Sequence, residues 1–238
     1  MLNEFSRTEL LIGKEAMQHL YHARVAVFGI GGVGGYVVEA LARSGVGAFD
    51  LIDDDKVCLT NINRQIIATR KTIGKYKVDV MEERVHSINP EAQVTVHKCF
   101  YLPETADQFD FTQYDYVVDA IDTLAPKIFL IYHSLQKGYR VVSSMGAGGK
   151  MDPEQIRIAD ISKSYNCNLA RMLRKRLHKL GVYKGVKVVF SPEEVDPETV
   201  VLSESENKKS NVGTISYMPP LFGCFCASVV IRDIANPI

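Results

Sequence analysis

The chain has 238 residues, of which 46% are hydrophobic and 24% are charged, a composition typical of a soluble globular protein with a substantial core. Lysine plus arginine and aspartate plus glutamate number 28 each, so the formal net charge is zero. This balance excludes strong steering of a polyanion by the whole molecule, and a nucleic acid would have to bind a local basic patch.

The first 23 residues contain three glutamates and lack the apolar run and the cleavage site of a signal peptide. We expect them to form an N-terminal arm of a single domain that spans residues 1–238. The five cysteines are scattered and include no CxxC pair. This pattern favours a reducing, cytoplasmic location and argues against a four-thiolate zinc site.

A predicted strand at residues 24–29 leads directly into a glycine-rich turn that contains Gly29, Gly31, Gly32 and Gly34, and a helix follows. In the GxGxxG spacing, the first glycine permits a tight turn and the second lets backbone N–H groups approach a phosphate. The third allows the helix to pack closely on the strand. The turn therefore predicts a nucleotide site, with a turn that binds nothing as the alternative.

Short β-branched runs alternate with longer amphipathic segments in the first part of the chain. We expect strands at residues 24–29, 48–53, 93–98, 115–119 and 139–144, and helices between them that include 76–89 and 126–137. This order predicts an α/β fold, with a Rossmann-like, mostly parallel sheet and helices on both faces. The glycine turn, Asp53 and residues 119–122 would then converge at the carboxyl ends of the strands.

After residue 144 we expect a glycine-rich turn, a strand at 156–161, a basic helix at 169–180 and a strand at 186–190. The acidic segment 191–213 is typical of a mobile loop. In the apolar segment 214–238, the stretch 214–231 contains Pro219-Pro220 and is shorter than the roughly 20 residues that a spanning helix requires. A buried C-terminal helix is favoured over a membrane anchor, and no stable membrane association is expected.

Charged residues follow the second predicted strand at positions that a dinucleotide site does not need. Asp53 is placed to hold a ribose hydroxyl, and Arg64 and Lys77 would bring cationic donors to the phosphates. A triphosphate is therefore a better ligand than a dinucleotide. The alternatives are a turn cap for Asp53, a surface ion pair for Arg64 and a solvated position for Lys77.

Five motifs, GxGGxG, DxD, NxxRQ, GxxK and DxxD, occur in an order that resembles the ubiquitin-activating-enzyme superfamily. This superfamily includes the ThiF- and MoeB-like sulfur-carrier adenylyltransferases. Within it, the segments FSRTELLIG, TNINRQI, INPE and SSMGAGGKMDP are similar to the tRNA threonylcarbamoyladenosine dehydratase subfamily. The similarity covers nearly the whole chain and implies an ATP-binding, ubiquitin-activating-enzyme-like fold.

The resemblance also implies the cofactors ATP and Mg²⁺ and a role for each motif residue. Asp53 would bind the ATP ribose, and Asp122 would support Mg²⁺ or the reacting α-phosphate. Arg7 lies in a segment that, in relatives, reaches into the partner subunit's site, which implies a homodimer. The remaining ATP-binding residues would be Asp55, Asn61, Arg64, Gln65 and Lys77, and those with a catalytic role would be Arg64, Lys77, Asp122 and Arg7.

The subfamily's substrate explains why no thiol nucleophile is needed. ATP activates the threonine carboxylate, and the carbamoyl group of the same modified base attacks it with loss of water. Cys167 has no nucleophile motif and no cation among its sequence neighbours, which favours a buried or incidental thiol. Asp119 would order its loop, and Lys127 would either add charge near the phosphates or pair with a carboxylate.

Basic residues gather between positions 163 and 187 and offer a surface for the tRNA. On the predicted helix, Leu173, Leu177 and Leu180 form an apolar stripe opposite the basic face. We expect the basic face to contact the anticodon arm, with an ordinary solvated helix as the alternative. The expected tRNA-binding residues are Arg171, Arg174, Lys175 and Lys179.

Three other functions remain open from the sequence. A sulfur-carrier protein adenylyltransferase of the same superfamily would need a docking surface for a Gly-Gly tail, and sulfur-transfer proteins are possible partners. An NAD-dependent oxidoreductase would bind NADH and not ATP. A nucleotide-sensing scaffold without turnover is disfavoured because Arg64, Lys77 and Asp122 are all present.

Overall fold

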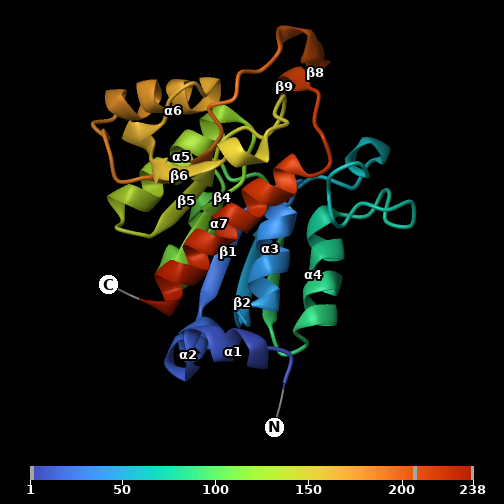
Figure 1. Ribbon diagram of the computed structural model, residues 1–238, viewed down its shortest axis with the longest axis vertical. Helices are drawn as coiled ribbons and strands as arrows, with labels where there is room; N and C mark the ends of the chain where they lie inside the picture. The colour runs from blue at the N-terminus through green and yellow to red at the C-terminus, as the bar shows by residue number, and fades with distance from the viewer. Residues whose placement is uncertain (1–2, 206–207, 237–238) are drawn as a thin grey trace.

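The computed structural model describes residues 3–205 and 208–236, so parts of the expected arm, loop and C-terminal segment lie outside the described residues. A central sheet lies between two helical layers (Figure 1). The predicted α/β fold, with a mostly parallel sheet and helices on both faces, is confirmed.

The central sheet has the strand order β3-β2-β1-β4-β5-β7-β6, and all neighbours are parallel except β6 and β7. Because Phe28 pairs with both Ile52 and Asp119, the loops after β1, β2 and β4 leave the sheet at one edge, which we call the carboxyl edge. The strands are β1 (Arg24–Phe28), β2 (Ala48–Ile52), β3 (Gln93–His97), β4 (Tyr116–Asp119), β5 (Val141–Ser144), β6 (Arg157–Asp160) and β7 (Lys187–Phe190).

Successive side chains of a strand point to opposite faces of the sheet, so the core is divided between these two faces. Val25 and Val27 of β1 join the core beneath α3, α4 and α7, whereas Ala26 and Phe28 join an aromatic core on the face that carries α5. Helix α6 packs on α5 through a third cluster. These helices are α3 (Gly34–Arg43), α4 (Lys77–Ile88), α5 (Leu124–Gln136), α6 (Asn168–Lys179) and α7 (Met218–Ala235).

The N-terminal arm forms two short helices, α1 (Ser6–Ile12) and α2 (Lys14–His22), which precede β1 directly. They lie at the end of the sheet opposite the carboxyl edge, at the bottom of Figure 1. Phe5 and Met17 are buried in the core, whereas Leu10 and Leu11 of α1 are each 85% exposed. The arm is therefore attached to the domain on one side and presents apolar side chains on the other.

The segment 191–213 contains two antiparallel strands, β8 (Val200–Ser205) and β9 (Lys208–Val212), where the sequence predicts a loop. Its acidic composition does not reveal the backbone pairing between two short segments of the same stretch. The hairpin lies at the carboxyl edge, at the top of Figure 1. Whether it moves is still a prediction.

Helix α7 is long and apolar enough to cross a membrane, yet more than half of it is buried inside the protein. It crosses α3, β5 and β7 as a core helix, as the sequence favours. Gly223 permits the close approach to α3, because a Cβ atom there would lie 2.6 Å from the carbonyl oxygen of Val33. The described residues contain no other helix that meets this length and composition test.

Candidate active site

The glycine turn connects β1 to α3 and packs against the loop that follows β4. Gly29 has a φ of +92°, and a Cβ atom there would lie 2.7 Å from the carbonyl oxygen of Ala120. The N–H of Ile30 donates to Oδ2 of Asp53, at 2.7 Å, just after β2. Glycine is therefore required at Gly29 for both its conformation and its contact, and the turn is fixed from two neighbouring loops.

Asp53 lies beside the glycine turn, as predicted, but both of its carboxylate oxygens accept backbone hydrogen bonds. Oδ2 accepts from Ile30, and Oδ1 accepts from the N–H of Asp55 at 2.9 Å. Burial raises the pKa of Asp53 above its ordinary value, although Lys77 and these hydrogen bonds oppose the shift. Asp53 therefore shapes the turn, and its contact with a ribose is still a prediction.

Lys77 is the first residue of α4, and its side chain is buried rather than solvated. Its Nζ atom lies 2.5 Å from Oδ2 of Asp55 and 3.7 Å from Oδ1 of Asp53. Asp54 completes a group of three carboxylates whose oxygens lie within 4.8 Å of one another. A lysine in this position offsets the like charges and offers a cation at the carboxyl edge.

The NxxRQ motif lies in a short 3-10 helix, η1 (Leu59–Asn61), and in the turn after it. Asn61 is buried, and its Oδ1 atom accepts from the N–H of Cys58 at 3.1 Å. The stem of Arg64 lies against Gly32, because a Cβ atom there would be 3.4 Å from the arginine Cγ. Its guanidinium donates to the carbonyl of Thr60 at 2.8 Å. The structure thus brings Arg64 to the glycine turn.

Gln65 carries an unusual feature of this turn. The residue is only 7% exposed, and its Oε1 atom has no hydrogen-bond partner among the described residues. The other amide atom, Nε2, lies 3.9 Å from the place that a Cβ atom on Gly31 would occupy. A buried polar atom without a partner costs free energy, which a ligand able to donate a hydrogen bond would recover.

Asp119 and Lys127 form a fully buried ion pair at the end of β4, as the structural alternative for Lys127 predicts. Nζ of Lys127 lies 2.6 Å from Oδ2 of Asp119 and also donates to the carbonyl of Ser144 at 2.9 Å. The other oxygen of Asp119 accepts from the N–H of Ile121 at 3.1 Å. The pair therefore fixes the loop that carries the exposed Asp122 at the start of α5.

Cys167 is buried at the start of α6, and the buried ammonium of Lys150 lies within electrostatic range of it. Burial lowers the pKa of Lys150, and Cys167 and Glu193 oppose that shift. The ammonium also donates to the carbonyl of Glu193. The sequence predicts no cation beside this thiol, because Cys167 has none among its sequence neighbours. The fold nevertheless brings Lys150, 17 residues earlier in the chain, close to it.

Two predicted residues lie elsewhere. Arg7 is exposed on α1, at the opposite end of the sheet from the glycine turn, so a single chain does not bring it to the site (Figure 1). Arg174 is half-buried on α6 and donates to the carbonyl of Ser164 at 2.7 Å. Its guanidinium holds the protein's own backbone, although the sequence predicts it on the open basic face.

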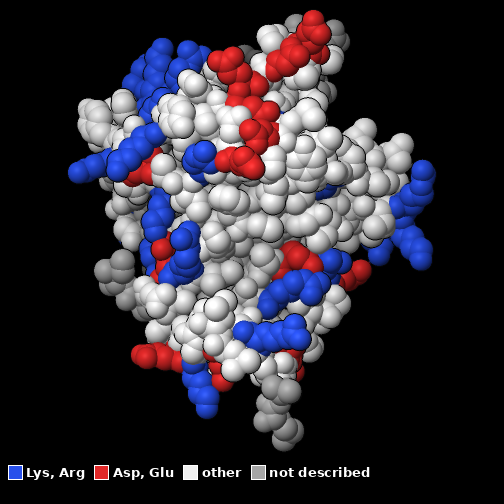
Figure 2. Space-filling model, in the orientation of Figure 1, with Lys and Arg blue, Asp and Glu red and all other residues white. Residues whose placement is uncertain are grey.

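The rest of the basic face of α6 is open to solvent, and Figure 2 shows blue side chains over this helix at the upper left. Leu173 and Leu177 are buried as predicted, whereas Leu180 is 43% exposed because the helix ends at Lys179. The exposed cations of the predicted set are Arg171, Lys175 and Lys179.

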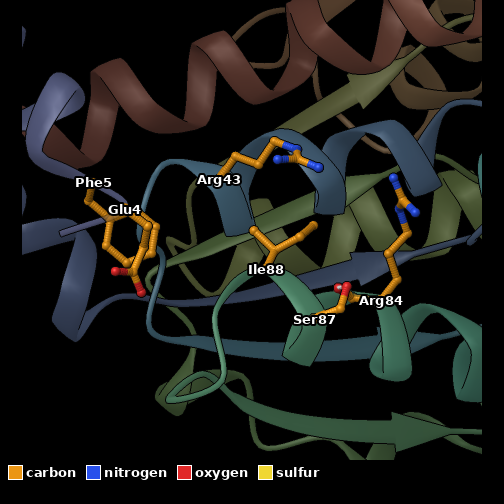
Figure 3. Close-up of a pocket in the computed structure, with 6 residues that line it drawn as sticks. All are labelled: Glu4, Phe5, Arg43, Arg84, Ser87 and Ile88. Atoms are coloured by element: carbon orange, nitrogen blue, oxygen red, sulfur yellow. Dashed lines mark hydrogen bonds between the residues drawn. The ribbon is translucent and has the colours of Figure 1, made fainter.

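A depression of about 290 Å³ lies away from the glycine turn, at the ends of α3 and α4 near the N-terminal arm (Figure 3). Arg43 and Arg84 line it, and both donate to the largely buried Glu39. Burial raises the pKa of Glu39, but the hydrogen bonds from Arg84 and Arg43 outweigh it and hold the pKa below its ordinary value. These ion pairs join α3 to α4 and are not part of the site at the carboxyl edge.

Comparison with protein families gives a match to the ThiF family over residues 5–237. The chain is 45% identical over 233 residues to tRNA threonylcarbamoyladenosine dehydratase of Bacillus subtilis, a match that covers 96% of this chain and 90% of that protein. It is also 45% identical over 196 residues to the protein of the same name from Escherichia coli, with 79% and 73% covered.

Comparison with solved structures also finds similarity to a tRNA threonylcarbamoyladenosine dehydratase. The crystal structure of the Escherichia coli tRNA N6-threonylcarbamoyladenosine dehydratase in complex with ATP matches with a TM-score of 0.88 and 40% identity, covering 97% of this chain and 93% of that one. A complex of the same protein with AMP matches with a TM-score of 0.87. The likeness therefore extends over the sheet, both helical layers and the carboxyl edge.

Proposed function

The chain belongs to the ThiF family, and on this basis we propose that it is an ATP-dependent enzyme that dehydrates threonylcarbamoyladenosine next to the anticodon of tRNA. The names of its relatives from Bacillus subtilis and Escherichia coli support this function. The observation that carries the proposal is the glycine turn, bounded by Asp53, Lys77 and Arg64, with the unpartnered oxygen of Gln65 beside it.

In the proposed reaction, a carboxylate oxygen of the threonyl group attacks the α- or γ-phosphorus of ATP, and the P–O bond to the leaving pyrophosphate or ADP breaks. The carbamoyl group of the same base then attacks the activated carbonyl, and the leaving phosphate or AMP takes the carboxylate oxygen with it. The net change in the base is the loss of one water molecule. Because the second attack is intramolecular, the effective concentration of the attacking group is high, about 10⁵ M or more in well-oriented systems, and no enzyme nucleophile is required.

Arg64 and Lys77 would neutralise charge on the phosphates as the new bond forms. Lys77 would exchange its contact with Asp55 for a phosphate oxygen, and Arg64 would turn from the carbonyl of Thr60. Oxygen ligands suit Mg²⁺, and the carboxylate-rich edge that includes Asp122 fits this ion. When bound, the ion would withdraw charge from the phosphate oxygens.

The tRNA would lie across the exposed cations of α6, because Arg171, Lys175 and Lys179 face solvent. We further propose a homodimer in which Arg7 of one chain completes the partner's site, and a cytoplasmic location. A sulfur-transfer partner belongs to the alternative function, a sulfur-carrier protein adenylyltransferase. That alternative predicts pyrophosphate exchange with ATP that a small carrier protein stimulates.

The test is to incubate the protein with ATP, Mg²⁺ and threonylcarbamoyladenosine-containing tRNA, to digest the tRNA and to weigh the modified nucleoside. Wild-type protein should convert it to a product lighter by one water. Arg64→Ala and Asp122→Ala should abolish the conversion, whereas Arg43→Ala, at the other end of α3, should retain it. Full activity in Arg64→Ala and Asp122→Ala would contradict the site, and no water loss with wild type would contradict the function.

A further inference from the structure

Tyr165 is an exposed aromatic side chain that the site described above does not use. The residue is 53% exposed, and its ring packs in a T-shaped arrangement with the ring of Phe190, with centroids 5.8 Å apart and planes at 78°. Phe190 is buried and is the last residue of β7. Tyr165 is thus anchored on a buried ring of the core and still has about half of its surface open to solvent.

The position of β7 places this ring at the same edge of the sheet as the loop that carries Asp122. Strands β4, β5 and β7 are consecutive in the sheet and parallel, so their last residues lie at the same edge. Neighbouring strands are about 4.8 Å apart, which separates the ends of β4 and β7 by about 10 Å. Asp122 follows β4 by three residues. The loop that carries Asp122 and the end of β7 on which Tyr165 packs therefore leave the sheet at the same edge, two strands apart.

The turn that carries Tyr165 is held in place by several contacts. Arg174 donates to the carbonyl and the hydroxyl of Ser164, and the hydroxyl of Ser164 donates to the carbonyl of Ile161 at 2.7 Å. Among the described residues, Asn166 is the only non-glycine residue with a positive φ, at 47°. A clamp on one side and a left-handed residue on the other fix the backbone of Tyr165 and limit the entropy lost on binding.

Exposed cations flank Tyr165 in the sequence, before it and on the helix that follows it. Lys163 lies two residues before it, and Arg171 and Lys175 lie on the first two turns of α6. Figure 2 shows the blue surface of this region, and no acidic residue occurs between 161 and 185. An aromatic ring among cations suits RNA whose bases are unpaired, because the bases stack while the cations contact the phosphates.

We propose that Tyr165 is a stacking platform for an unpaired base of the tRNA anticodon loop, next to the base whose modification is cyclised. The proposal rests on the proposed function and adds a residue that recognises single-stranded RNA near the site. Arg174 is a positioning residue for this platform through Ser164 and does not contact RNA itself. Stacking of this kind tolerates different bases, so the platform would orient the loop without selecting its sequence.

The experiment measures binding of an unmodified anticodon stem-loop RNA to the full chain and to variants over a range of salt concentrations. Tyr165→Ala should weaken binding at least about fivefold, the lower limit expected for the loss of one base–aromatic stack. Tyr165→Phe should bind like wild type. Because no phosphate contact is lost, the salt dependence of Tyr165→Ala should match wild type, whereas Lys175→Glu/Lys179→Glu should flatten it.

Tyr183→Ala is the matched control. Tyr183 is 63% exposed and packs on His178, with ring centroids 5.0 Å apart, but it precedes β7 and so lies towards the other edge of the sheet. Its loss should leave RNA binding unchanged. A second probe, a blunt-ended RNA duplex of two strands, should bind wild type and Tyr165→Ala equally, since it offers no unpaired base to stack.

Equal binding of the stem-loop by wild type and Tyr165→Ala would overturn the platform, as would a loss in Tyr165→Phe as large as in Tyr165→Ala. These results leave the proposed function standing if wild type still removes water from the modified tRNA. Failure of wild type to bind either RNA would overturn the platform and the proposed tRNA surface of α6, whereas the proposed function is contradicted only if wild type also removes no water from the modified tRNA. Thermal melting of each variant separates loss of the fold from loss of binding.

Discussion

At the scale of single residues, the candidate site contains groups whose arrangement is costly for the fold. Gln65 buries an amide oxygen without a partner among the described residues, beside Gly31. Lys77 is buried at the start of a helix, where a cation faces the unfavourable end of the helix dipole. Such costs are typical of functional sites, where binding rather than folding selects the residue.

Gln65→Leu should separate the effect of Gln65 on the stability of the fold from its effect on ATP binding. We expect the ligand-free variant to be as stable as wild type or more stable by up to about 1–2 kcal/mol, because the unpaired buried oxygen is removed. ATP binding should weaken, because the bound nucleotide loses a polar partner. Urea unfolding without nucleotide and calorimetric titration with ATP measure the two quantities. A variant that is destabilised by more than about 2 kcal/mol and binds ATP normally would assign Gln65 to the fold.

The sequence predicted several of the residues that the structure brings together at the carboxyl edge, but it did not predict their contacts. Gly29, Asp53 and Arg64 are brought together because the motifs follow adjacent parallel strands, which is a property of the topology. The burial of Lys77 depends on Asp55, a local partner that could have been noticed from the DxD spacing. By contrast, the contact of Arg174 with Ser164 depends on a turn whose geometry no sequence period reveals.

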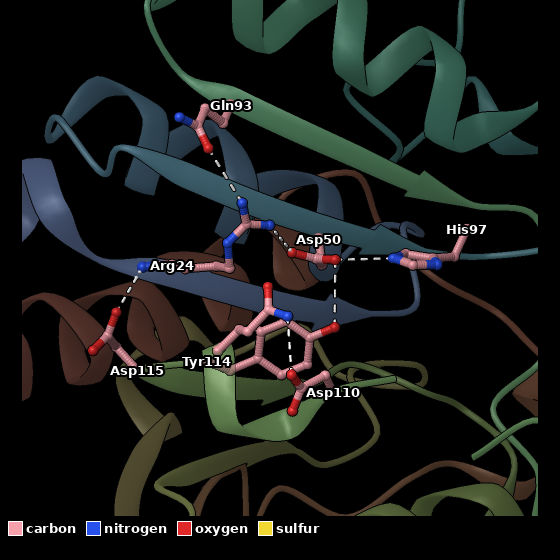
Figure 4. Close-up of polar contacts among 8 residues, drawn as sticks. Arg24, Asp50, Gln93, His97, Asp110, Tyr114 and Asp115 are labelled. Atoms are coloured by element: carbon pink, nitrogen blue, oxygen red, sulfur yellow. Dashed lines mark hydrogen bonds and ion pairs between the residues drawn. The ribbon is translucent and has the colours of Figure 1, made fainter. Parts of the chain in front are cut away.

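At the scale of elements, a buried carboxylate joins β2 to its neighbours (Figure 4). Asp50 accepts from Arg24 of β1 at 2.6 Å, from Nε2 of His97 of β3 at 2.9 Å and from the hydroxyl of Tyr114 at 3.3 Å. Burial raises the pKa of Asp50, but the hydrogen bonds from His97 and Arg24 outweigh it and lower the pKa below its ordinary value.

This network predicts a loss of stability in acid. Because the pKa of Asp50 is lower in the folded state than in the unfolded state, its contribution is fully present well above the unfolded value of about 3.9. The contribution is lost as the pH falls through that value towards the folded pKa. Asp50→Asn should therefore reduce the free energy of unfolding at neutral pH by about 1–3 kcal/mol and flatten its decline below about pH 5. Urea unfolding at a series of pH values measures both.

Asp54→Asn is the comparison for this prediction, because the shift has the opposite sign. Burial and the neighbouring Asp55 raise the pKa of Asp54, so its contribution to stability falls as the pH rises through the raised value. Replacing the Asp54 carboxylate should therefore make the free energy of unfolding decline more steeply in acid. A decline with the same slope in wild type and Asp50→Asn would show that other carboxylates control acid unfolding.

The sequence predicted the strands of the central sheet better than it predicted the hairpin and the end of α6. Predicted and observed strands agree within two residues, because β-branched runs are short and are bounded by polar residues. The hairpin of β8 and β9 was missed, since its pairing depends on backbone geometry within an acidic segment. Leu180 was assigned to the apolar stripe of α6, but the helix ends one residue earlier and leaves it half exposed.

At the scale of the whole molecule, charge and apolar surface are distributed unevenly although the net charge is zero. The cations of α6 gather on one side of the sheet, and the exposed leucines of α1 lie at the end opposite the carboxyl edge. Arg7 is beside those leucines and cannot reach the glycine turn of its own chain. A contribution of Arg7 to catalysis therefore requires a second copy.

Mixing two inactive variants tests this requirement. Arg7→Ala should be inactive because it supplies no arginine to its partner, and Asp122→Ala because its own site is incomplete. In a heterodimer of the two, the Arg7→Ala chain keeps its Asp122 and receives Arg7 from the other chain, so one of the two sites is complete. With random assembly from equal amounts, half of the dimers are mixed, and about a quarter of the wild-type activity should return. The readout is water loss from the modified tRNA after the chains are mixed and allowed to exchange, with each variant alone as the baseline. Normal activity in Arg7→Ala alone, or no recovery from a mixture shown to contain heterodimers, would mean that each chain completes its own site.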